Sequence, residues 1–396
     1  MKSGRLNSSS SKPRLLVVGS LPPPYSGYET ATQVLMESGI RNHFRIRLLN
    51  TRTTRNPSAR GRLSLANVLS TFQVLLKLIF ELIRFRPHIA NIPLAQNRTG
   101  FLKWLSLTFC CKVAQCKIVS RLGGASFNKF YEASTPLMQS TIRFGLCLVD
   151  TLIVRGPSLK QQFNGLVRGE QIQVVPNGFD IQGWKSGLPL KQRKTSKCLH
   201  VLYLGQVSKA KGVLDLLEAV AILEQQDRVH EYEFVVAGPI IERELNIRHI
   251  DNPENTSKAI REITDRLNLE EGLVRFVGEV SWEEKRKLYV WADVVVLPSY
   301  SEGFPYTVLE AFASECAVIC TPVGALPDHL RDGEQVLFVP VNSPPSIANA
   351  LIRLKDYRLR LSLTRKASQY LLENHSLNIF SIKMTEIFHQ VLDPKA

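Results

Sequence analysis

Residues 294–310 read VVVLPSYSEGFPYTVLE, and this stretch decides the fold. Its four leading apolar residues, Val294–Leu297, are typical of a strand buried in a parallel sheet. A short loop with Glu302 and Gly303 follows. Pro305 then suits the first position of a helix, because its missing N–H would lack a partner there in any case. Strand, glycine-bearing loop and helix form the unit of a doubly wound α/β domain, whose ligands bind at the carboxyl ends of the strands.

The same unit recurs along the chain. Apolar strand-like runs that end in or next to glycine occupy residues 14–19, 198–205, 234–238 and 274–278, and further strands are expected near 88–92, 117–122, 151–154 and 317–320. A chain of 396 residues suits two domains of about 150–200 residues each. We therefore predict an α/β protein with two Rossmann-like, doubly wound domains that face a central cleft.

The domain boundaries follow from changes in composition. Residues 1–13 are Ser-rich and basic and are expected to be a disordered leader. The first domain is predicted over 14–180, a polar basic linker over 181–197, and the second domain over 198–375. A final helix at about 376–394 is expected to pack back on the first domain.

The net positive charge comes entirely from the first half of the chain. Residues 1–180 hold 24 Lys and Arg against 7 Asp and Glu, a net +17, whereas residues 181–396 hold 26 against 28, a net −2. Such a field favours a polyanionic partner, such as nucleic acid, an anionic bilayer or phosphorylated lipids, although excess Arg also serves solubility. Residues 48–62 are expected to form an exposed Arg-rich loop.

Two apolar helices are predicted at residues 64–85 and 100–113. Their intermittent Lys and Arg suit amphipathic helices that lie on a membrane interface, and equally suit the outer layer of an α/β domain. The longest apolar run, residues 63–83, is interrupted by Asn67, Gln73, Lys77 and Glu81, so a membrane-spanning helix is not expected.

The loop after residues 294–297 carries groups that suit an activated sugar. Free N–H groups and the positive dipole end of the following helix can hold a diphosphate. Gly303 lets the backbone approach closely, Glu302 can accept hydrogen bonds from sugar hydroxyls, and Glu310 can accept two from the vicinal diol of a ribose.

Glu302 and Glu310, with seven residues between them, resemble the E-x7-E motif of the retaining GT4 glycosyltransferases, which have the GT-B fold. Supporting pieces occur in the family's order: Val175–Gly178, Gly205 followed by Lys211–Gly212, Ala237–Gly238, Phe276–Gly278 and Ala292–Asp293. The resemblance covers roughly residues 14–390 and is densest over 199–340. It implies GT-B architecture and a nucleotide diphosphate sugar as the donor substrate.

The resemblance also implies roles for single residues. Lys211 would neutralise the donor diphosphate, Glu310 would bind the ribose and Glu302 the transferred hexose. The implied substrate-binding set is Gly27, Gly124, Ser126, Gln206, Lys209, Gly238, Gly303, Phe304, Pro305 and Thr307.

Two positions depart from the family pattern. Gln206 stands where the family usually has Arg, and Gly123 stands where many relatives have His. A missing charged donor is worth about 1.5–3 kcal/mol. Lys209 in the same loop, or Arg121 across the cleft, is expected to compensate for Gln206.

The sequence lacks the motifs of P-loop nucleotidases and of metal-dependent transferases. The sequence has no P-loop and no D-x-D pair, so a metal-independent donor site is expected, with no cofactor. Cys110, Cys111 and Cys116 lie in an apolar stretch without a His–Cys partner at ligand spacing and are expected to be buried, reduced thiols in a cytosolic protein.

The expected function is transfer of a hexose to a lipid-linked or cell-surface polysaccharide acceptor at the inner face of the plasma membrane. A soluble enzyme that makes a small glycoside or storage glucan is the alternative. A third alternative, a basic membrane- or nucleic-acid-binding protein with a degenerate GT-B fold, remains open, but specific nucleic-acid recognition lacks a known module here.

Overall fold

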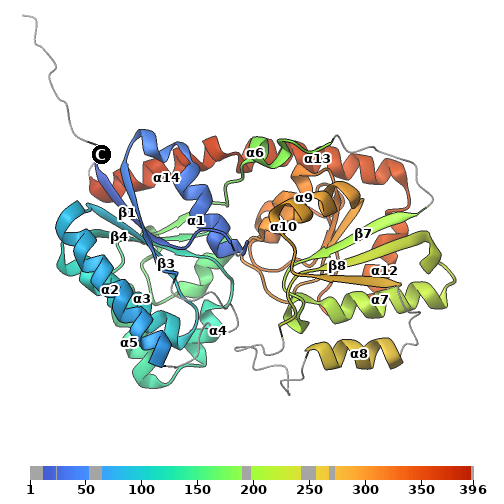
Figure 1. The fold of residues 1–396 in the computed structure, drawn as a ribbon, viewed down its shortest axis with the longest axis horizontal. Coiled ribbons are helices and arrows are strands. Elements are labelled where there is room, and N and C mark those ends of the chain that lie inside the picture. Colours follow the sequence, from blue (N-terminus) through green and yellow to red (C-terminus); the bar gives the residue numbers. More distant parts are fainter. Residues whose placement is uncertain are drawn as a thin grey trace, which may run out of the picture.

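The computed structural model describes residues 12–23, 25–52, 65–189, 198–241, 256–266 and 273–393. These residues form two α/β domains that lie side by side (Figure 1). Most of the predicted leader and residues 190–197 of the predicted linker lie outside the described residues.

The N-terminal domain is built on a six-stranded parallel sheet with the order β2-β1-β3-β4-β5-β6. Its strands are β1 (Arg14–Gly19), β2 (Arg45–Asn50), β3 (Ile89–Leu94), β4 (Lys117–Leu122), β5 (Thr151–Val154) and β6 (Ile172–Val174). The strands β1, β3, β4 and β5 are almost entirely buried, which explains their continuous apolar sequences.

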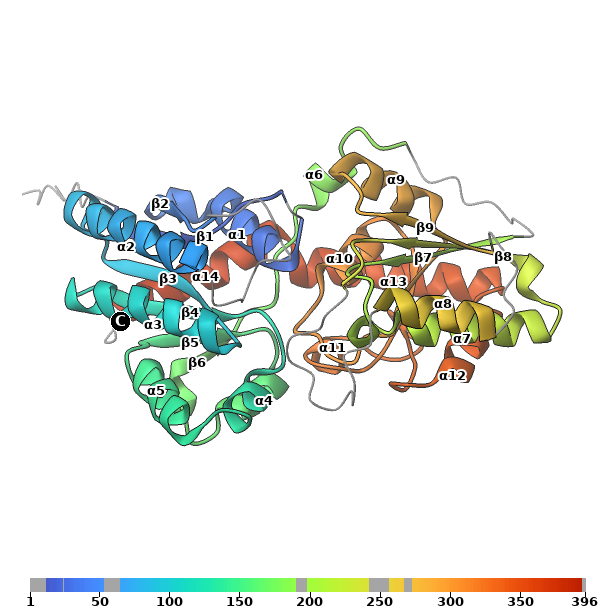
Figure 2. The same ribbon diagram turned by 60° about the horizontal axis from the view of Figure 1, so that its bottom comes forward.

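Helices cover both faces of this sheet. They are α1 (Gly27–Glu37), α2 (Leu65–Phe85), α3 (Arg98–Val113), α4 (Phe127–Glu132) and α5 (Pro136–Cys147), with short 3-10 segments at Gly39–Asn42 (η1), Pro157–Phe163 and Gly169–Gln171. Helix α3 packs against both α2 and α5. The three helices α2, α3 and α5 therefore form one outer layer, visible as a row in Figure 2.

The C-terminal domain repeats the plan with the strand order β12-β11-β10-β7-β8-β9. Its strands are β7 (Leu199–Leu204), β8 (Tyr232–Ala237), β9 (Val274–Gly278), β10 (Val294–Leu297), β11 (Ala317–Cys320) and β12 (Leu337–Phe338). Its helices are α7 (Val213–Gln225), α8 (Thr256–Arg266), α9 (Trp282–Trp291), α10 (Tyr306–Ala313), α11 (Leu326–His329), α12 (Pro344–Arg353) and α13 (Tyr357–His375), with 3-10 turns at Lys209–Lys211 and Val229–Glu231.

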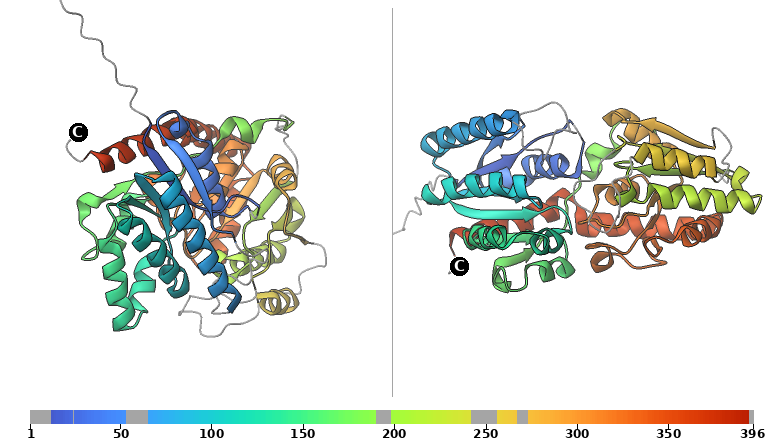
Figure 3. Two further views of the ribbon diagram at one scale, coloured as in Figure 1. Left: turned by 60° about the vertical axis from the view of Figure 1, so that its left-hand side comes forward. Right: turned by 90° about the horizontal axis from the view of Figure 1, so that it is seen from below.

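The last helix, α14 (Leu377–Leu392), crosses back to the N-terminal domain. The ring of Phe388 meets Phe44 at 5.6 Å between centroids, and both side chains are buried in the core that α14 shares with the N-terminal sheet. Seen from below, the red helices α13 and α14 run along both domains (Figure 3, right).

Two local predictions were wrong. Leu48–Asn50 belong to β2 and not to an exposed loop, because the edge strand pairs with β1 along its whole length. Pro305 caps α10 with extended backbone, ψ 138°, so the helix begins at Tyr306. The described part of the predicted linker begins with a short helix, α6 (Ile181–Lys185), whose Trp184 side chain is buried.

Candidate active site

Three glycines bring the strand ends of the C-terminal domain together. Gly238, at the end of β8, has φ +138°, and a Cβ there would lie 1.7 Å from the carbonyl oxygen of Gly205. Its N–H donates to the carbonyl of Gly278 at 2.7 Å. No side chain fits at Gly238, so the glycine expected from the family motif has a structural reason in this chain.

Lys211 and Glu302 form an ion pair at the carboxyl end of the sheet. The Lys211 Nζ lies 2.5 Å from Glu302 Oε1, which also accepts a hydrogen bond from Ser299 Oγ at 2.9 Å. Gly212, with φ +72°, sits so close to the backbone of Pro298 that a Cβ would overlap its carbonyl oxygen. This close approach sets the lysine loop against the end of β10. The two side chains keep 27% and 12% of their surface exposed.

Glu310 lies in a different environment from Glu302. Its Oε1 accepts from Lys285 Nζ at 2.6 Å and its Oε2 from the Tyr289 hydroxyl at 2.9 Å. The side chains of Lys285 and Glu310 are only 7% and 4% exposed. Burial, followed by the charge of Glu310, raises the pKa of Tyr289 well above its ordinary value, so this hydroxyl stays a donor. Both oxygens of Glu310 are thus occupied by protein groups.

Aromatic rings surround Lys285. Its Nζ lies 4.7 Å from the centre of the Trp282 ring and 5.3 Å from that of Trp184. Tyr25, from the loop between β1 and α1, stacks on Trp282 at 5.1 Å. The N-terminal domain therefore reaches the Glu310 neighbourhood through Tyr25.

Loops of the two domains touch beside Glu302. Ser126 Oγ lies 3.0 Å from Ser301 Oγ, and a Cβ on Gly303 would lie 2.2 Å from the carbonyl oxygen of Gly123. A Cβ on Gly27 would lie 3.9 Å from the ring of Tyr306. The predicted residues Gly27, Ser126 and Gly303 are thus brought to one interface, and Gly303 leaves no room for a side chain.

Phe304 anchors the loop between β10 and α10 through contacts with Asn177 and His375. Its carbonyl accepts from Asn177 Nδ2 at 2.8 Å, and its ring stacks on His375 at 5.0 Å. Burial lowers the pKa of His375 to about 4, so the imidazole is neutral at pH 7. Its Nδ1 lies 2.7 Å from the carbonyl of Asn177, and since a carbonyl only accepts, Nδ1 carries the proton. This arrangement ties the loop to the segments that cross between the domains.

The remaining predicted residues surround these groups more loosely. Gln206 and Lys209 are exposed in the loop before α7. Thr307 Oγ1 lies 3.5 Å from the carbonyl of Leu204, and Gly124 lies against Gln96, whose Oε1 accepts from the Ser126 N–H. Their roles toward substrate stay predictions.

Lys285, Tyr289 and Trp282 were missed by the motif analysis. A usable signal was present, since the capping box at Ser281 and Glu284 fixes the start of α9. Lys285 and Tyr289 are then four residues apart on one face of that helix. What the sequence could not supply is the partner, because α9 and α10 are brought together only by the sheet. Among the described residues, no group of three His, Cys, Asp or Glu side chains could hold a metal ion.

Residues 198–356 match the sequence family Glycosyl transferases group 1. The matched segment lies within the C-terminal domain. The group 1 domain contains Lys211, Glu302, Glu310 and the three strand-end glycines, so the resemblance stated from those residues is confirmed at the level of the family.

Known proteins extend this comparison beyond the group 1 domain. The chain is 28% identical over 221 residues to the D-inositol 3-phosphate glycosyltransferase of Corynebacterium glutamicum, covering 53% of this chain and 50% of that one. The matched region thus spans about half the length of that curated relative.

Two solved structures cover nearly the whole chain. Sucrose-phosphate synthase from Thermosynechococcus elongatus superposes with a TM-score of 0.70 at 16% identity over 97% of this chain and 100% of that one. Anabaena HepE in complex with UDP and glucose gives 0.63 at 16% identity, over 95% and 99%. At this identity the likeness establishes the fold. Both domains together have the GT-B architecture, as predicted.

Proposed function

We propose that this protein is a glycosyltransferase that moves a hexose from a nucleotide diphosphate sugar to an acceptor, with retention of anomeric configuration. The observation that carries the proposal is the Lys211–Glu302 pair at the loop before α10, facing Gly124–Ser126 of the other domain. An ammonium for phosphate and a carboxylate for sugar hydroxyls stand side by side, which is what an activated sugar requires. The group 1 family of the domain supports the same activity.

The reaction needs little chemistry from side chains. In a same-face displacement the departing phosphate oxygen takes the proton of the acceptor hydroxyl, so no protein base is required. The contribution of Lys211 and of the N–H groups at the start of α10 is to stabilise the negative charge that develops on the leaving diphosphate. Glu302 then positions the hexose, and the Gly27 loop covers the donor from the other domain. A metal ion is not required by this scheme.

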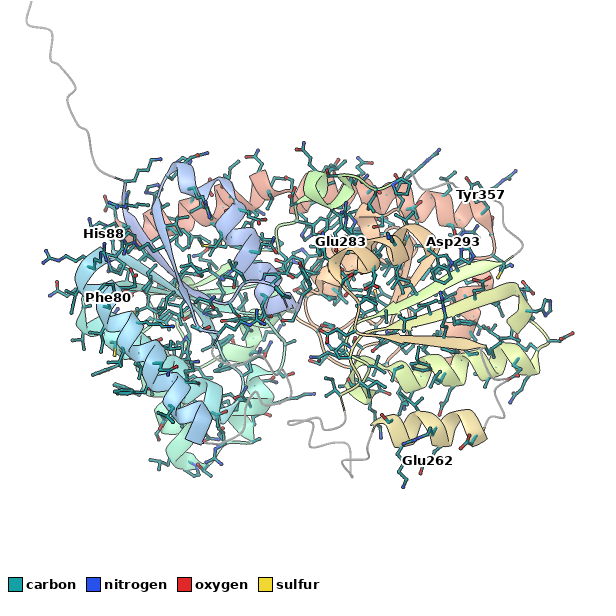
Figure 4. The ribbon with its side chains drawn as sticks, in the orientation of Figure 1. Phe80, His88, Glu262, Glu283, Asp293 and Tyr357 are labelled. Atoms are coloured by element: carbon teal, nitrogen blue, oxygen red, sulfur yellow. The ribbon has the colours of Figure 1, made fainter. Side chains whose placement is uncertain are left out.

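The outer layer α2–α3–α5 supports an acceptor at a membrane surface. Of the nineteen large apolar side chains that are exposed among the described residues, eleven belong to these three helices. On α2 they are Leu69, Phe72, Leu76, Ile79, Phe80 and Ile83, of which five follow one another at spacings of three and four residues. Phe80 is labelled at the outer edge of the domain in Figure 4. A continuous exposed apolar stripe of this kind marks an interaction surface.

The charges of the layer select an anionic bilayer as its partner. The three helices contain six basic residues, Lys77, Arg84, Arg98, Lys103, Lys112 and Arg143, against the single acid Glu81, which is paired with Arg47. Apolar residues between basic ones suit the interface of a membrane with anionic lipids. No helix in the described part of the chain is long and apolar enough to cross a bilayer. We therefore propose peripheral binding at the inner face of the plasma membrane and a lipid-linked or cell-surface polysaccharide acceptor.

A thermal-shift panel of UDP-, GDP- and ADP-sugars tests the donor site. One nucleotide sugar should raise the melting temperature of the wild-type protein, because a ligand of the folded state stabilises it. Lys211→Met should abolish the shift, while Lys366→Met, which removes an exposed lysine of α13, should keep it. A panel without any shift, or a shift that Lys211→Met leaves intact, would count against the donor site.

Vesicle flotation tests the membrane surface. The wild-type protein should float with vesicles that contain phosphatidylglycerol and much less with pure phosphatidylcholine. The double variant Phe80→Glu/Ile83→Glu should remain at the bottom of the gradient, whereas Leu372→Glu, at an equally exposed apolar position on α13, should float. If the double variant and Leu372→Glu floated equally well, the proposal that the α2–α3–α5 layer binds the membrane would be wrong. A wild-type protein that forms dimers and does not float would assign the layer to a second copy of the chain and favour a soluble acceptor.

A further inference from the structure

Two arginines of the N-terminal domain are buried without a negative partner. Arg121, in β4, and Arg155, directly after β5, are each 3% exposed. Neither forms an ion pair with any residue that the structure describes. Burial of a charge is costly unless an opposite charge or a set of hydrogen bonds replaces the lost water, so this pair requires an explanation.

Hydrogen bonds to the protein occupy little of the two guanidinium groups. Arg121 Nη1 donates to the carbonyl of Ala31 at 3.2 Å, and Arg155 Nη1 donates to the carbonyl of Val175 at 3.2 Å. The Nε of Arg121 is buried with no hydrogen-bond partner. A guanidinium has five N–H donors, and neutral carbonyls do not cancel its charge. N–H donors and the positive charges of Arg121 and Arg155 therefore remain available to bind a ligand.

The two arginines lie near the same element of the other domain. Burial raises the pKa of Tyr306, the first residue of α10, to about 12, and the charges of Arg155 and Arg121 oppose this rise. Burial, and next the neighbouring Arg155, lowers the pKa of Arg121 to about 10, so Arg121 remains charged at pH 7. The positive charges of Arg121 and Arg155 repel one another and lie near the positive end of the α10 dipole. An anion bound between them would be attracted by both guanidinium groups and by the helix dipole.

The loop that carries Lys211 indicates which anion fits. Residues 205–212 contain the neutral Gln206 and no arginine, so the C-terminal side of the proposed donor site offers lysines but no guanidinium for a phosphoryl group. Arg121 lies one residue before the end of β4, and Arg155 directly follows β5. The loops after these two strands contact the other domain: a Cβ on Gly303 would meet the carbonyl oxygen of Gly123, a Cβ on Gly156 would meet Asp328, and Ser158 Oγ donates to Asp328 at 2.7 Å. They thus border the same interface from the opposite domain.

We propose that Arg121 and Arg155 together bind a phosphoryl group at the interface with the start of α10. The inference rests on the proposed function and adds a cationic site from the N-terminal domain to it. The phosphoryl group is either the diphosphate of the donor or a phosphate on the acceptor. The guanidinium groups are anchored by hydrogen bonds to the carbonyls of Ala31 and Val175 of their own domain, so both belong to the N-terminal side of the interface.

Binding titrations on the full chain test this proposal. UDP, inorganic pyrophosphate and glycerol 3-phosphate are each titrated into the wild-type protein and into Arg121→Met, Arg155→Met and the control Arg168→Met, which removes an exposed arginine of the same domain. The Kd for at least one probe should rise tenfold or more in both buried-site variants and stay unchanged in the control. Weakening of UDP and pyrophosphate assigns the site to the donor; weakening of glycerol 3-phosphate alone assigns it to the acceptor.

Unchanged binding of all three probes in both variants would overturn the proposal. If Arg155→Met does not fold, Arg155→Lys replaces it: the charge is kept and the planar fork is lost, so pyrophosphate should still bind more weakly than to the wild type. Lys211→Met separates the two proposals. UDP binding that survives Lys211→Met but not Arg155→Met would refute the proposed donor site and keep the arginine site, and the reverse result would do the opposite.

Discussion

Two lysine–carboxylate pairs flank the start of α10, and they differ in how much water reaches them. Lys211–Glu302 lies at the interface of the domains with part of both side chains exposed, whereas Lys285–Glu310 is enclosed by Trp184, Trp282 and Tyr289. Their N–O distances, 2.5 and 2.6 Å, are nearly the same. Distance alone would therefore rank them as equal, while burial predicts opposite roles: the open pair can exchange its partner for a substrate, and the closed pair holds the fold.

Removal of the Lys285 ammonium should have the largest effect on the stability of the protein. Lys285→Met should lower the free energy of unfolding by about 3–5 kcal/mol, because Glu310 would be left as an unpaired buried charge. Urea unfolding measures the change. The double variant Lys285→Met/Glu310→Met should recover much of the loss, since a buried pair is replaced by apolar side chains. A single variant that loses less than about 1 kcal/mol would show that solvent reaches Glu310.

The open pair should respond in catalysis and not in stability. Lys211→Met is expected to lower kcat by about 100- to 1000-fold, because a donor to the developing charge is lost. Its free energy of unfolding should change by no more than about 1 kcal/mol. Steady-state kinetics beside urea unfolding give both numbers for one preparation. An unfolding loss as large as that of Lys285→Met would erase the distinction between the pairs.

A third carboxylate shows what happens when a lysine acts only from a distance, as Lys209 does on Asp215. Asp215, near the start of α7, accepts from the Tyr300 hydroxyl at 3.0 Å, and its other oxygen is buried without a partner. Burial raises its pKa to about 6 from 3.8. The folded state therefore holds this proton more tightly than the unfolded state, and stability from this group falls as the pH rises from about 4 to 6.

Asp215→Asn should accordingly be stabilising at pH 7 and nearly neutral below pH 4. Two pKa units correspond to about 3 kcal/mol, and partial access of water reduces the expected gain to about 1–2 kcal/mol. Thermal unfolding of both proteins between pH 3.5 and 7.5 measures it. A gain that is the same at every pH would assign the effect to packing and not to the charge.

The smallest expected effect concerns Gln206, in the exposed loop before the open pair. Gln206→Arg should tighten the binding of UDP about three- to tenfold, by adding a cation beside Lys211. Isothermal titration measures the Kd. If the arginine at 206 and Arg121 contact one diphosphate, Gln206→Arg should lower the Kd by a larger factor in an Arg121→Met background than in the wild type. Weaker binding of UDP would indicate that the loop has no room for the longer side chain.

Sequence reasoning reached the open pair but not the closed one. Residues 294–310 predicted strand, loop and helix, and the family resemblance implied that Lys211 and Glu302 serve one donor site. The structure brings the two side chains together because they follow neighbouring parallel strands, β7 and β10. The partner of Glu310 depends on how α9 lies against α10, which no residue spacing encodes. Edge strand β2 was missed for a different reason: Arg45 and Arg47 place charged groups on either side of Ile46, so the continuous apolar signal of a central strand is absent.

The path of α14 affects how the protein is made. The helix completes the core of the N-terminal domain through Phe380, Met384 and Phe388, yet a ribosome synthesises it only after the whole C-terminal domain. The first domain must therefore wait, with the apolar surface around Phe44 uncovered, until translation has passed residue 392. Folding order along this chain is thus set by its last helix, and the nascent N-terminal half is a natural client for chaperones that recognise exposed apolar surface.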